Sequence, residues 1–108
     1  MKSKDKEEAQ KLQKIADLKP GDRKVSVRFK VLKKVAEREV FLRRDFSKHR
    51  VAELLVGDDS GTIVLTLWDD NIDKVEVNGN YRVENGYVTT FRGSPRLNVG
   101  RYGRIIRE

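Results

Sequence analysis

Two predicted strands carry aromatic side chains on the face that should meet water. In the first, residues 62–68, apolar side chains at positions 63, 65 and 67 alternate with Val64, Thr66 and Trp68. Because successive side chains of a strand point to opposite faces, the apolar set predicts the core face and Trp68 lies on the other. An indole ring left in solvent can stack on an unpaired nucleic-acid base. The chemistry to consider first is therefore noncovalent binding by stacking.

The second strand repeats this arrangement. Tyr87, Thr89 and Phe91 occupy alternate positions, so two rings with a small polar residue between them share one face. If the two strands adjoin, Trp68, Tyr87 and Phe91 form one exposed plane, with Thr66 and Thr89 as polar contacts. Two other interpretations remain open at this point: Trp68 packs beneath the C-terminal segment, or a long loop shields Tyr87 and Phe91.

The charge of the chain favours a polyanionic partner. The 108 residues carry a formal net charge of +7, and the sequence pI is about 9.8. Residues 1–17 hold five lysines and four acidic residues, which leaves 19 basic and 13 acidic residues in the remainder. The alternative is a heat-adapted protein with many surface ion pairs, since 38% of residues are charged. The cations predicted to contact phosphates are Arg28, Lys30, Arg43, Arg44, Lys48, Arg92, Arg96 and Arg101.

Residues typical of catalytic and metal sites are scarce. The sequence contains no cysteine, which excludes disulfides, thiolate catalysis and cysteine-ligated zinc. His49, the only histidine, has no partner for a metal site and lies in a charged segment, so a solvated side chain is expected. The aspartate pairs 58–59 and 69–70 flank predicted strands, where aspartates commonly stabilise turns and helix caps. A two-metal nuclease site would need carboxylates that converge from several strands, so these pairs do not predict one. The sequence therefore predicts a protein that is not an enzyme and needs no metal or cofactor.

The sequence has no segment typical of a membrane or secreted protein. No apolar run approaches the roughly 20 residues that span a bilayer. The charged N-terminal residues are not followed by an apolar segment of the signal-peptide type. We therefore expect a cytoplasmic protein, associated with the nucleoid and without a membrane partner.

Alternating apolar segments separated by turn residues predict an all-β fold. The first strand has a cationic outer face, and the charged segment after it predicts two strand extensions joined by a basic hairpin tip. A turn at 57–61 joins the next two strands as a hairpin, and Asp69 or Asp70 would cap a short helix after them. The predicted elements are strand 25–31, extensions 33–50, strands 51–56 and 62–68, helix 69–75, strands 81–84, 87–91 and 96–100, and a final strand or docked segment within 101–108.

One short internal helix between the third and fourth of five or six strands predicts a five- to six-stranded OB-fold barrel. Residues 15–108 are expected to form this single domain. Residues 1–14 are expected to form a charged N-terminal arm or short helix.

Four short motifs resemble one protein family. They are residues 59–63, residues 65–69, the run 84–93 that contains Tyr87 and Phe91, and Leu97-Asn98-Val99-Gly100. Together they resemble the simple single-OB-fold single-stranded DNA-binding proteins of archaea and their eukaryotic relatives, which are related to the OB domains of replication protein A. Lys19-Pro20-Gly21 is similar to the turn that leads into the family's first strand. The resemblance covers about residues 15–106.

The resemblance implies that Trp68, Tyr87 and Phe91 stack on bases of single-stranded DNA. It implies a non-catalytic protein that coats single strands in replication, recombination or repair, with replication or repair proteins as possible partners. We expect the protein to be a monomer. Some relatives carry an aromatic residue where this chain has Asn98, and the family's long tail is not present after Glu108. Two alternatives remain open: an RNA-binding OB-fold, because rings and charge do not distinguish a 2′-hydroxyl, and a protein-interaction OB-fold of a replication assembly.

Overall fold

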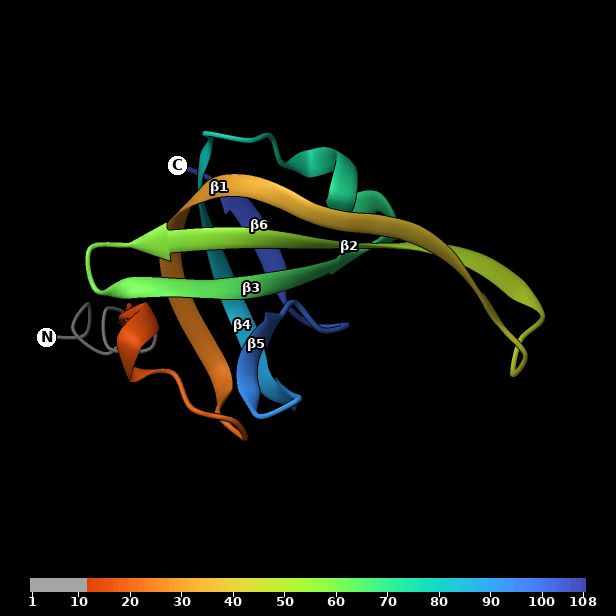
Figure 1. The fold of residues 1–108 in the computed structure, drawn as a ribbon, viewed down its shortest axis with the longest axis horizontal. Coiled ribbons are helices and arrows are strands. Elements are labelled where there is room, and N and C mark those ends of the chain that lie inside the picture. The colour runs from red at the N-terminus through yellow and green to blue at the C-terminus, as the bar shows by residue number, and fades with distance from the viewer. Residues whose placement is uncertain (1–11) are drawn as a thin grey trace, which may run out of the picture.

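The computed structural model describes residues 12–108, which form a barrel of six strands with a long hairpin extending from it (Figure 1). The predicted N-terminal arm lies outside the described residues, apart from its last three positions. The elements in chain order are the 3-10 helix η1 (Ile15–Asp17), strands β1 (Arg23–Leu42), β2 (Ser47–Asp58) and β3 (Gly61–Trp68), the 3-10 helix η2 (Asp69–Lys74), and strands β4 (Asn80–Phe91), β5 (Ser94–Asn98) and β6 (Arg104–Arg107).

Strand β1 closes the barrel because it pairs with two different neighbours. Its first part, Arg23 to Lys30, runs antiparallel to β4, and the part from Lys30 to Leu42 runs antiparallel to β2. The sheet order is β1-β2-β3-β5-β4-β6, with β3 and β5 parallel. This closed antiparallel sheet with one parallel pair, and with η2 between β3 and β4, confirms the predicted OB-fold barrel.

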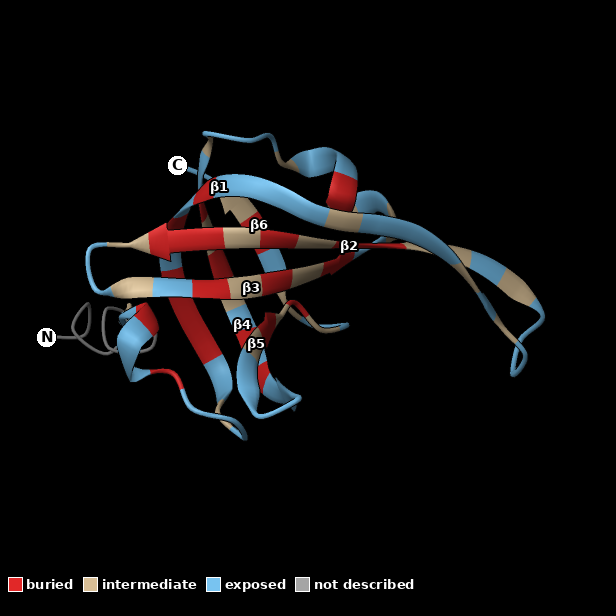
Figure 2. Cartoon of the chain, viewed as in Figure 1, coloured by how far each residue is buried: buried red, intermediate tan, exposed pale blue. Residues whose placement is uncertain are grey.

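The core is made by the inward faces that the alternation predicted. Val25, Val27 and Val31 are fully buried, and the alternate apolar residues of β2 and β3 lie against them. Figure 2 shows the buried stretches gathered inside the barrel, whereas the projecting part of the β1–β2 hairpin is mostly exposed. The alternation stops after Val31 because the β1–β2 register shifts twice, between Val31 and Lys33 and between Lys34 and Ala36.

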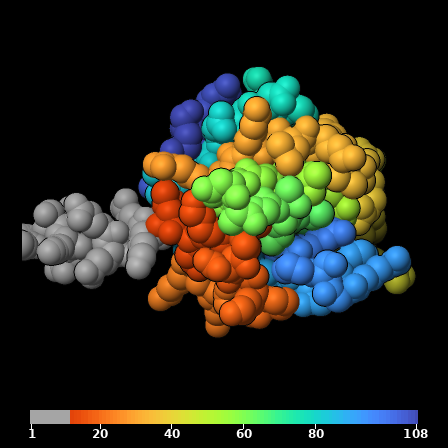
Figure 3. Space-filling model, turned by 60° about the vertical axis from the view of Figure 1, so that its left-hand side comes forward, coloured from red at the N-terminus to blue at the C-terminus, as the bar shows by residue number. Residues whose placement is uncertain are grey.

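The β2–β3 turn also fixes the N-terminal segment. The carboxylate of Asp58 accepts hydrogen bonds from the backbone N–H groups of Ser60, Gly61 and Ile15 at 2.7, 3.2 and 3.0 Å. Lys14 Nζ lies 2.8 Å from Asp59 Oδ1. Figure 3 shows the residues of this segment packed against the turn. Asp58 therefore serves the turn, as predicted from the sequence, whereas Asp59 binds Lys14 of the N-terminal segment.

Two local predictions about the region after β3 need adjustment. The predicted helix is present as the 3-10 helix η2, but no side chain caps it and its N-cap residue is Trp68. Asp69 is instead the first residue of η2 and faces β2. Within residues 12–108, no helix is long and apolar enough to cross a membrane.

Candidate nucleic-acid interface

Trp68, Tyr87 and Phe91, together called the ring surface below, lie on strands that are joined by β5. A single row of paired residues crosses the sheet on this outer face. Thr66 on β3 pairs with Asn98 on β5, which pairs with Tyr87 on β4. Trp68 lies two residues beyond Thr66 on β3, and Phe91 lies four residues beyond Tyr87 on β4, so both stay on the same side.

All three rings are partly open to solvent. The exposed fractions are 43% for Trp68, 40% for Tyr87 and 47% for Phe91. Neither alternative raised from the sequence describes this face, because the C-terminal segment does not bury Trp68 and the long loop does not bury the other two rings. A groove of about 290 Å³ lies between two of the rings, and its lining includes Thr66, Trp68, Tyr87, Asn98 and Arg101. We call it the central groove.

Phe91 is bracketed by arginines. The guanidinium carbons of Arg92 and Arg96 lie 5.2 and 4.3 Å from the centre of its ring. Arg92 and Gly93 both have positive φ, 51° and 84°, which makes the β4–β5 connection a tight two-residue turn and brings Arg96 back beside Phe91. Arg96 is not a free cation, because its Nη1 lies 2.9 Å from the carboxylate of Glu53, in a pair whose side chains are 18% and 17% exposed.

Trp68 is positioned by the residue that follows it and by β2. Asp69 has a φ of 50°, a left-handed conformation that an aspartate adopts at some cost. The conformation is stabilised because Asp69 accepts hydrogen bonds from the backbone N–H of Arg50 at 3.0 Å and from His49 Nδ1 at 2.7 Å. These two donors lower the pKa of Asp69, the backbone bond having the larger effect. The sharp turn at Asp69 therefore ends β3 directly after Trp68 and leads the chain into η2.

The prediction that His49 is a solvated loop residue is wrong. The residue lies on β2 with its side chain 27% exposed, and its ring meets the indole of Trp68 edge-on at a centroid distance of 6.3 Å. Its Nε2 lies 2.7 Å from Ser47 Oγ. His49 lies within a predicted strand extension rather than in the hairpin tip, and the pairing of β2 with β3 brings it next to the end of the tryptophan strand. His49 is therefore part of the support of the ring surface.

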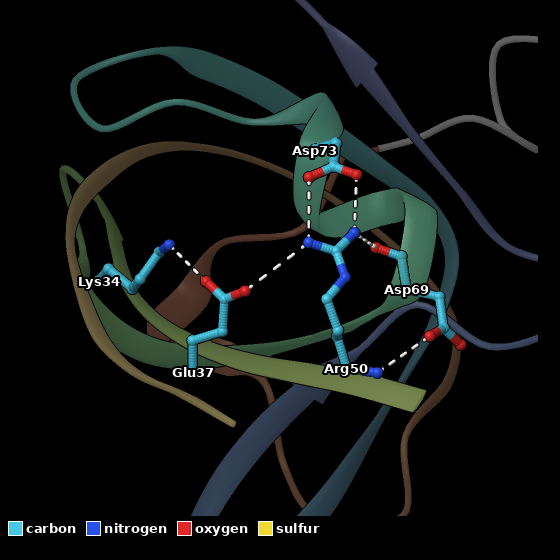
Figure 4. A network of polar contacts seen from close by, with 5 residues as sticks. All are labelled: Lys34, Glu37, Arg50, Asp69 and Asp73. Carbon is cyan, nitrogen blue, oxygen red and sulfur yellow. Dashed lines mark hydrogen bonds and ion pairs between the residues drawn. The ribbon is translucent and has the colours of Figure 1, made fainter. Parts of the chain in front are cut away.

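Arg50 ties β2 to η2 through a network of polar contacts (Figure 4). Its guanidinium donates to the carboxylate of Asp73 at 2.7 and 3.3 Å and to the carbonyl oxygen of Asp69 at 3.3 Å. Glu37, on the β1 side, lies 3.7 Å from Arg50 and 2.6 Å from Lys34. The bidentate bond from Arg50 lowers the pKa of Asp73 and raises that of Arg50. The network fixes the position of η2 relative to β2.

The structure separates the predicted cations into three groups. Arg92, Arg96 and Arg101 lie beside the ring surface or line the central groove. Arg43 and Arg44 lie in the turn of the projecting hairpin, and Lys48, 3.9 Å from Glu39, follows them on β2. Arg28 and Lys30 lie on a different part of the barrel.

The structure does not bring Arg28 and Lys30 to the ring surface. Arg28 is paired with Arg82 of β4 and contacts Glu108 at 2.7 Å, and Lys30 is paired with Asn80. The residue of β1 that lies opposite Tyr87 is Arg23, which the sequence reasoning did not select. The first part of β1 runs along β4 from Tyr87 to Asn80, so the two ends of the same cationic face reach different sides of the barrel. Arg28 and Lys30 therefore lie away from the ring surface.

Asn98 lies at the centre of the face, between Thr66 and Tyr87 in the row of paired residues. Its amide donates to Thr89 Oγ1 at 3.0 Å and to the carbonyl oxygen of Arg96 at 3.2 Å. Both predicted threonines lie on the outer face, Thr66 in the central groove and Thr89 as the partner of Asn98. The short side chain of Asn98 leaves the space between Trp68 and Tyr87 open, because a ring at this position would occupy it.

The fold and this face define a class of protein: a small OB barrel that presents exposed rings and cations on one side of its sheet. Residues 18–107 match the family model described as "Single-stranded DNA binding protein Ssb-like, OB fold". The chain belongs to this family, as the sequence motifs predicted.

Individual relatives agree with this assignment. The chain is 29% identical over 93 residues to the single-stranded DNA binding protein Ssb of Saccharolobus solfataricus, a match that covers 86% of this chain and 62% of that protein. The fold is similar to that of an OB domain from Thermoplasma acidophilum (TM-score 0.77, 25% identity, 90% and 86% of the two chains). It is also similar to the second OB-fold domain of replication protein A from Methanococcus maripaludis (TM-score 0.71, 25% identity, 88% and 92%). The chain spans less than two thirds of the length of the curated relatives it matches.

Proposed function

We propose that this domain binds single-stranded DNA with little dependence on base sequence, by stacking bases on Trp68, Tyr87 and Phe91. One observation carries the proposal: three rings, each 40–47% exposed, share one outer face of the sheet. Any base offers a π face to a ring, so such contacts tolerate every sequence, and each typically contributes about 1–3 kcal/mol.

Cations at the edges of the face supply the second part of the affinity. Arg92 and Arg101 flank the rings, and Arg43, Arg44 and Lys48 lie on the hairpin that projects beyond β2. If about four cations neutralise phosphates, log affinity should fall against log salt with a slope of about −3, from about −0.7 per contact on single strands. A single OB-fold of this size covers only several nucleotides.

The biological role that follows is non-catalytic: the protein coats and protects unpaired DNA during replication, recombination or repair. The names of two relatives support this proposed role, since one is a single-stranded DNA binding protein and the other is a domain of replication protein A. We propose that the protein acts as a monomer inside the cell and that its protein partners come from the same processes.

Titration with labelled oligonucleotides tests the proposal. The expected result is tight, salt-sensitive binding to single-stranded DNA, quenching of the fluorescence of Trp68, the only tryptophan in the chain, and much weaker binding to duplex DNA. Equal or higher affinity for RNA of the same sequence would show an RNA-binding protein instead. Absence of binding to every nucleic acid would refute the proposal and favour a protein contact at the ring surface.

A further inference from the structure

A second and larger groove continues from the central groove on the far side of Tyr87. It measures about 750 Å³, and Tyr87, Gly100 and Arg101 line both grooves. The two spaces are therefore contiguous, with the tyrosine ring between them. The other residues that line the larger groove are Gly21, Asp22, Arg23, Lys24, Asn85, Val88 and Tyr102. We call it the Tyr102 groove.

One wall of this groove is a turn with an unusual pair of residues at its corners. The N–H of Gly103 donates to the carbonyl oxygen of Gly100 at 3.1 Å, so Arg101 and Tyr102 occupy the two central positions. Central turn positions commonly hold glycine, asparagine, aspartate, serine or proline, because these residues suit the turn backbone. A cation and an aromatic ring are not explained by the turn itself, and Tyr102 is 80% exposed.

The backbone of the turn is held firmly although its side chains are open. The side-chain amide of Asn85 donates to the carbonyl oxygen of Tyr102 at 3.2 Å. At Gly103, a Cβ atom would lie 2.8 Å from the carbonyl oxygen of Asn85, so the turn packs directly on the backbone of β4. At Gly100, a Cβ atom would lie 2.8 Å from Tyr87 Cε1, so the turn also contacts the ring of Tyr87. Tyr102 is thus presented from a fixed support next to a member of the ring surface.

The opposite wall carries two cations at an irregular point of β1. Arg23 pairs with Tyr87 and Val25 pairs with Gly86, and the register shifts between these pairs. Lys24, at the shift, has a φ of 53°, in the left-handed region that a lysine seldom adopts. Bulges of this kind redirect side chains and occur often beside functional sites.

The charge balance of the groove favours an anion. Among residues 12–108, Arg23, Lys24 and Arg101 make no ion pair within 4.0 Å, whereas other cations such as Lys14 and Arg28 do. The lining contains one acidic residue, Asp22, whose carboxylate accepts the backbone N–H of Lys19 at 2.9 Å. A nucleotide needs cations for its phosphate and an exposed ring on which its base can stack. The groove offers three cations, only one carboxylate and the ring of Tyr102.

We propose that the Tyr102 groove is a further nucleotide subsite, in which the strand passes Tyr87, stacks a base on Tyr102 and places a phosphate near Arg23 and Lys24. This inference rests on the proposed function, because it extends the same strand beyond the ring surface. It predicts that the strand length needed for full affinity exceeds what three rings alone accommodate.

A comparison of oligonucleotide lengths tests the subsite. Wild-type protein and Tyr102→Ala are titrated with a short oligothymidylate of about four nucleotides and a longer one of about eight, since one OB-fold covers about 4–16 nucleotides. Loss of the stacked base should weaken binding of the longer strand about five- to tenfold and change binding of the short strand less than about twofold. Tyr102→Phe keeps the ring and should bind both lengths like the wild type.

Two further variants separate the charge of the groove from the net charge of the protein. Lys24→Gln should weaken binding of the longer strand and make its salt dependence less steep by about 0.7, whereas Lys74→Gln, on η2, removes the same charge outside both grooves and should not. Trp68 stays in all of these variants, so quenching of its fluorescence at saturation by the short strand should be unchanged.

The outcomes distinguish the subsite from the function on which it rests. If Tyr102→Ala binds both lengths like the wild type while Trp68→Ala weakens both, the subsite is refuted and the ring surface stands. If Tyr102→Ala weakens both lengths equally, the ring belongs to the central site, and the extension is likewise refuted. If the wild type binds neither strand, both proposals fail. Thermal unfolding of each variant checks that it is folded, and the Tyr102 variants are expected to be, because Tyr102 is 80% exposed.

Discussion

Removing the negative charge of Glu53 should strengthen binding of single-stranded DNA at low salt. Glu53 pairs with Thr66 across the β2–β3 ladder, so it extends the row of residues that runs through Asn98 to Tyr87. Its carboxylate lies 2.9 Å from Arg96 and 3.7 Å from Arg38, and it neutralises cations next to the ring surface. Glu53→Gln keeps the size of the side chain and an oxygen acceptor for Arg96, but it removes the charge.

The size of the effect follows from the position of this charge. A unit charge about 7 Å from a phosphate in water changes the binding free energy by about 0.6 kcal/mol, which corresponds to about threefold in affinity. If Arg96 becomes available for one more phosphate contact, the salt dependence steepens by about 0.7. A fourfold rise in salt then reduces affinity by an additional factor of about 2.6, so the advantage present near about 50 mM salt should be nearly gone near about 200 mM.

Fluorescence anisotropy of a labelled oligothymidylate at several salt concentrations measures both quantities. Glu76→Gln is the matched control, because Glu76 is 74% exposed on its side chain, lies 4.0 Å from Arg107 and lines neither groove. It makes the same change in net charge and should leave affinity and slope unchanged. Equal affinities of the wild type and Glu53→Gln at low salt, or an unchanged slope, would refute the reasoning that Arg96 borders the DNA.

Three further predictions concern the rings and the acidic turns. Trp68→Ala should lose about 1–3 kcal/mol of binding free energy while the barrel stays folded; unfolding of this variant, seen by circular dichroism, would instead place the indole in the core. Asp58→Ala should lower the free energy of unfolding by about 1–3 kcal/mol in a urea titration, because three backbone N–H groups lose their acceptor; a change below about 0.5 kcal/mol would contradict this. Hydrogen bonds lower the pKa of Asp69, and they also lower the pKa of Asp58, where they outweigh the opposing effect of burial. The free energy of unfolding should therefore be full above about pH 4 and should fall as the pH drops through the lowered pKa values. Asp69→Asn should show a smaller loss over the same acid range, and an identical pH profile would show that this carboxylate is not a source of the effect.

The fold and the identity of the three rings could be predicted because they depend on local patterns. Alternation along β3 and β4 is a property of neighbouring residues, and it places Trp68 and Phe91 on the outer face without knowledge of any partner strand. The OB-fold follows from the order of strands, turns and one short helix, which is also visible locally. The turn residues from Asp58 to Gly61 and Gly93 have residue types that suit turns, whereas Arg92 has a φ of 51° that an arginine seldom adopts.

The remaining parts of the site depend on pairings between residues far apart in the sequence. Arg23, rather than Arg28, lies opposite Tyr87 because the β1–β4 register is set by the barrel and by a bulge. His49 appeared to be a solvated residue in a charged segment, since nothing nearby in the sequence shows that its ring contacts Asp69 and Trp68 about 20 residues away. Tyr102 carried no periodic signal at all, and its place beside Tyr87 follows only from the turn that Asn85 holds.

The parallel pairing of β3 with β5 explains why this barrel has an open groove where the rings are found. Trp68 and Tyr87 come from strands that are not neighbours, and the strand between them contributes Asn98 to the same row. Because an asparagine is short and its amide is bonded to Thr89 and to the backbone at Arg96, it keeps the rings apart without filling the space. In the proposed complex a base enters between two rings that the β-sheet already holds in position, so little conformational entropy should be lost when the strand binds. The same rigid support continues past Tyr87 to the turn that carries Tyr102, which is the basis of our proposal that one strand occupies both grooves.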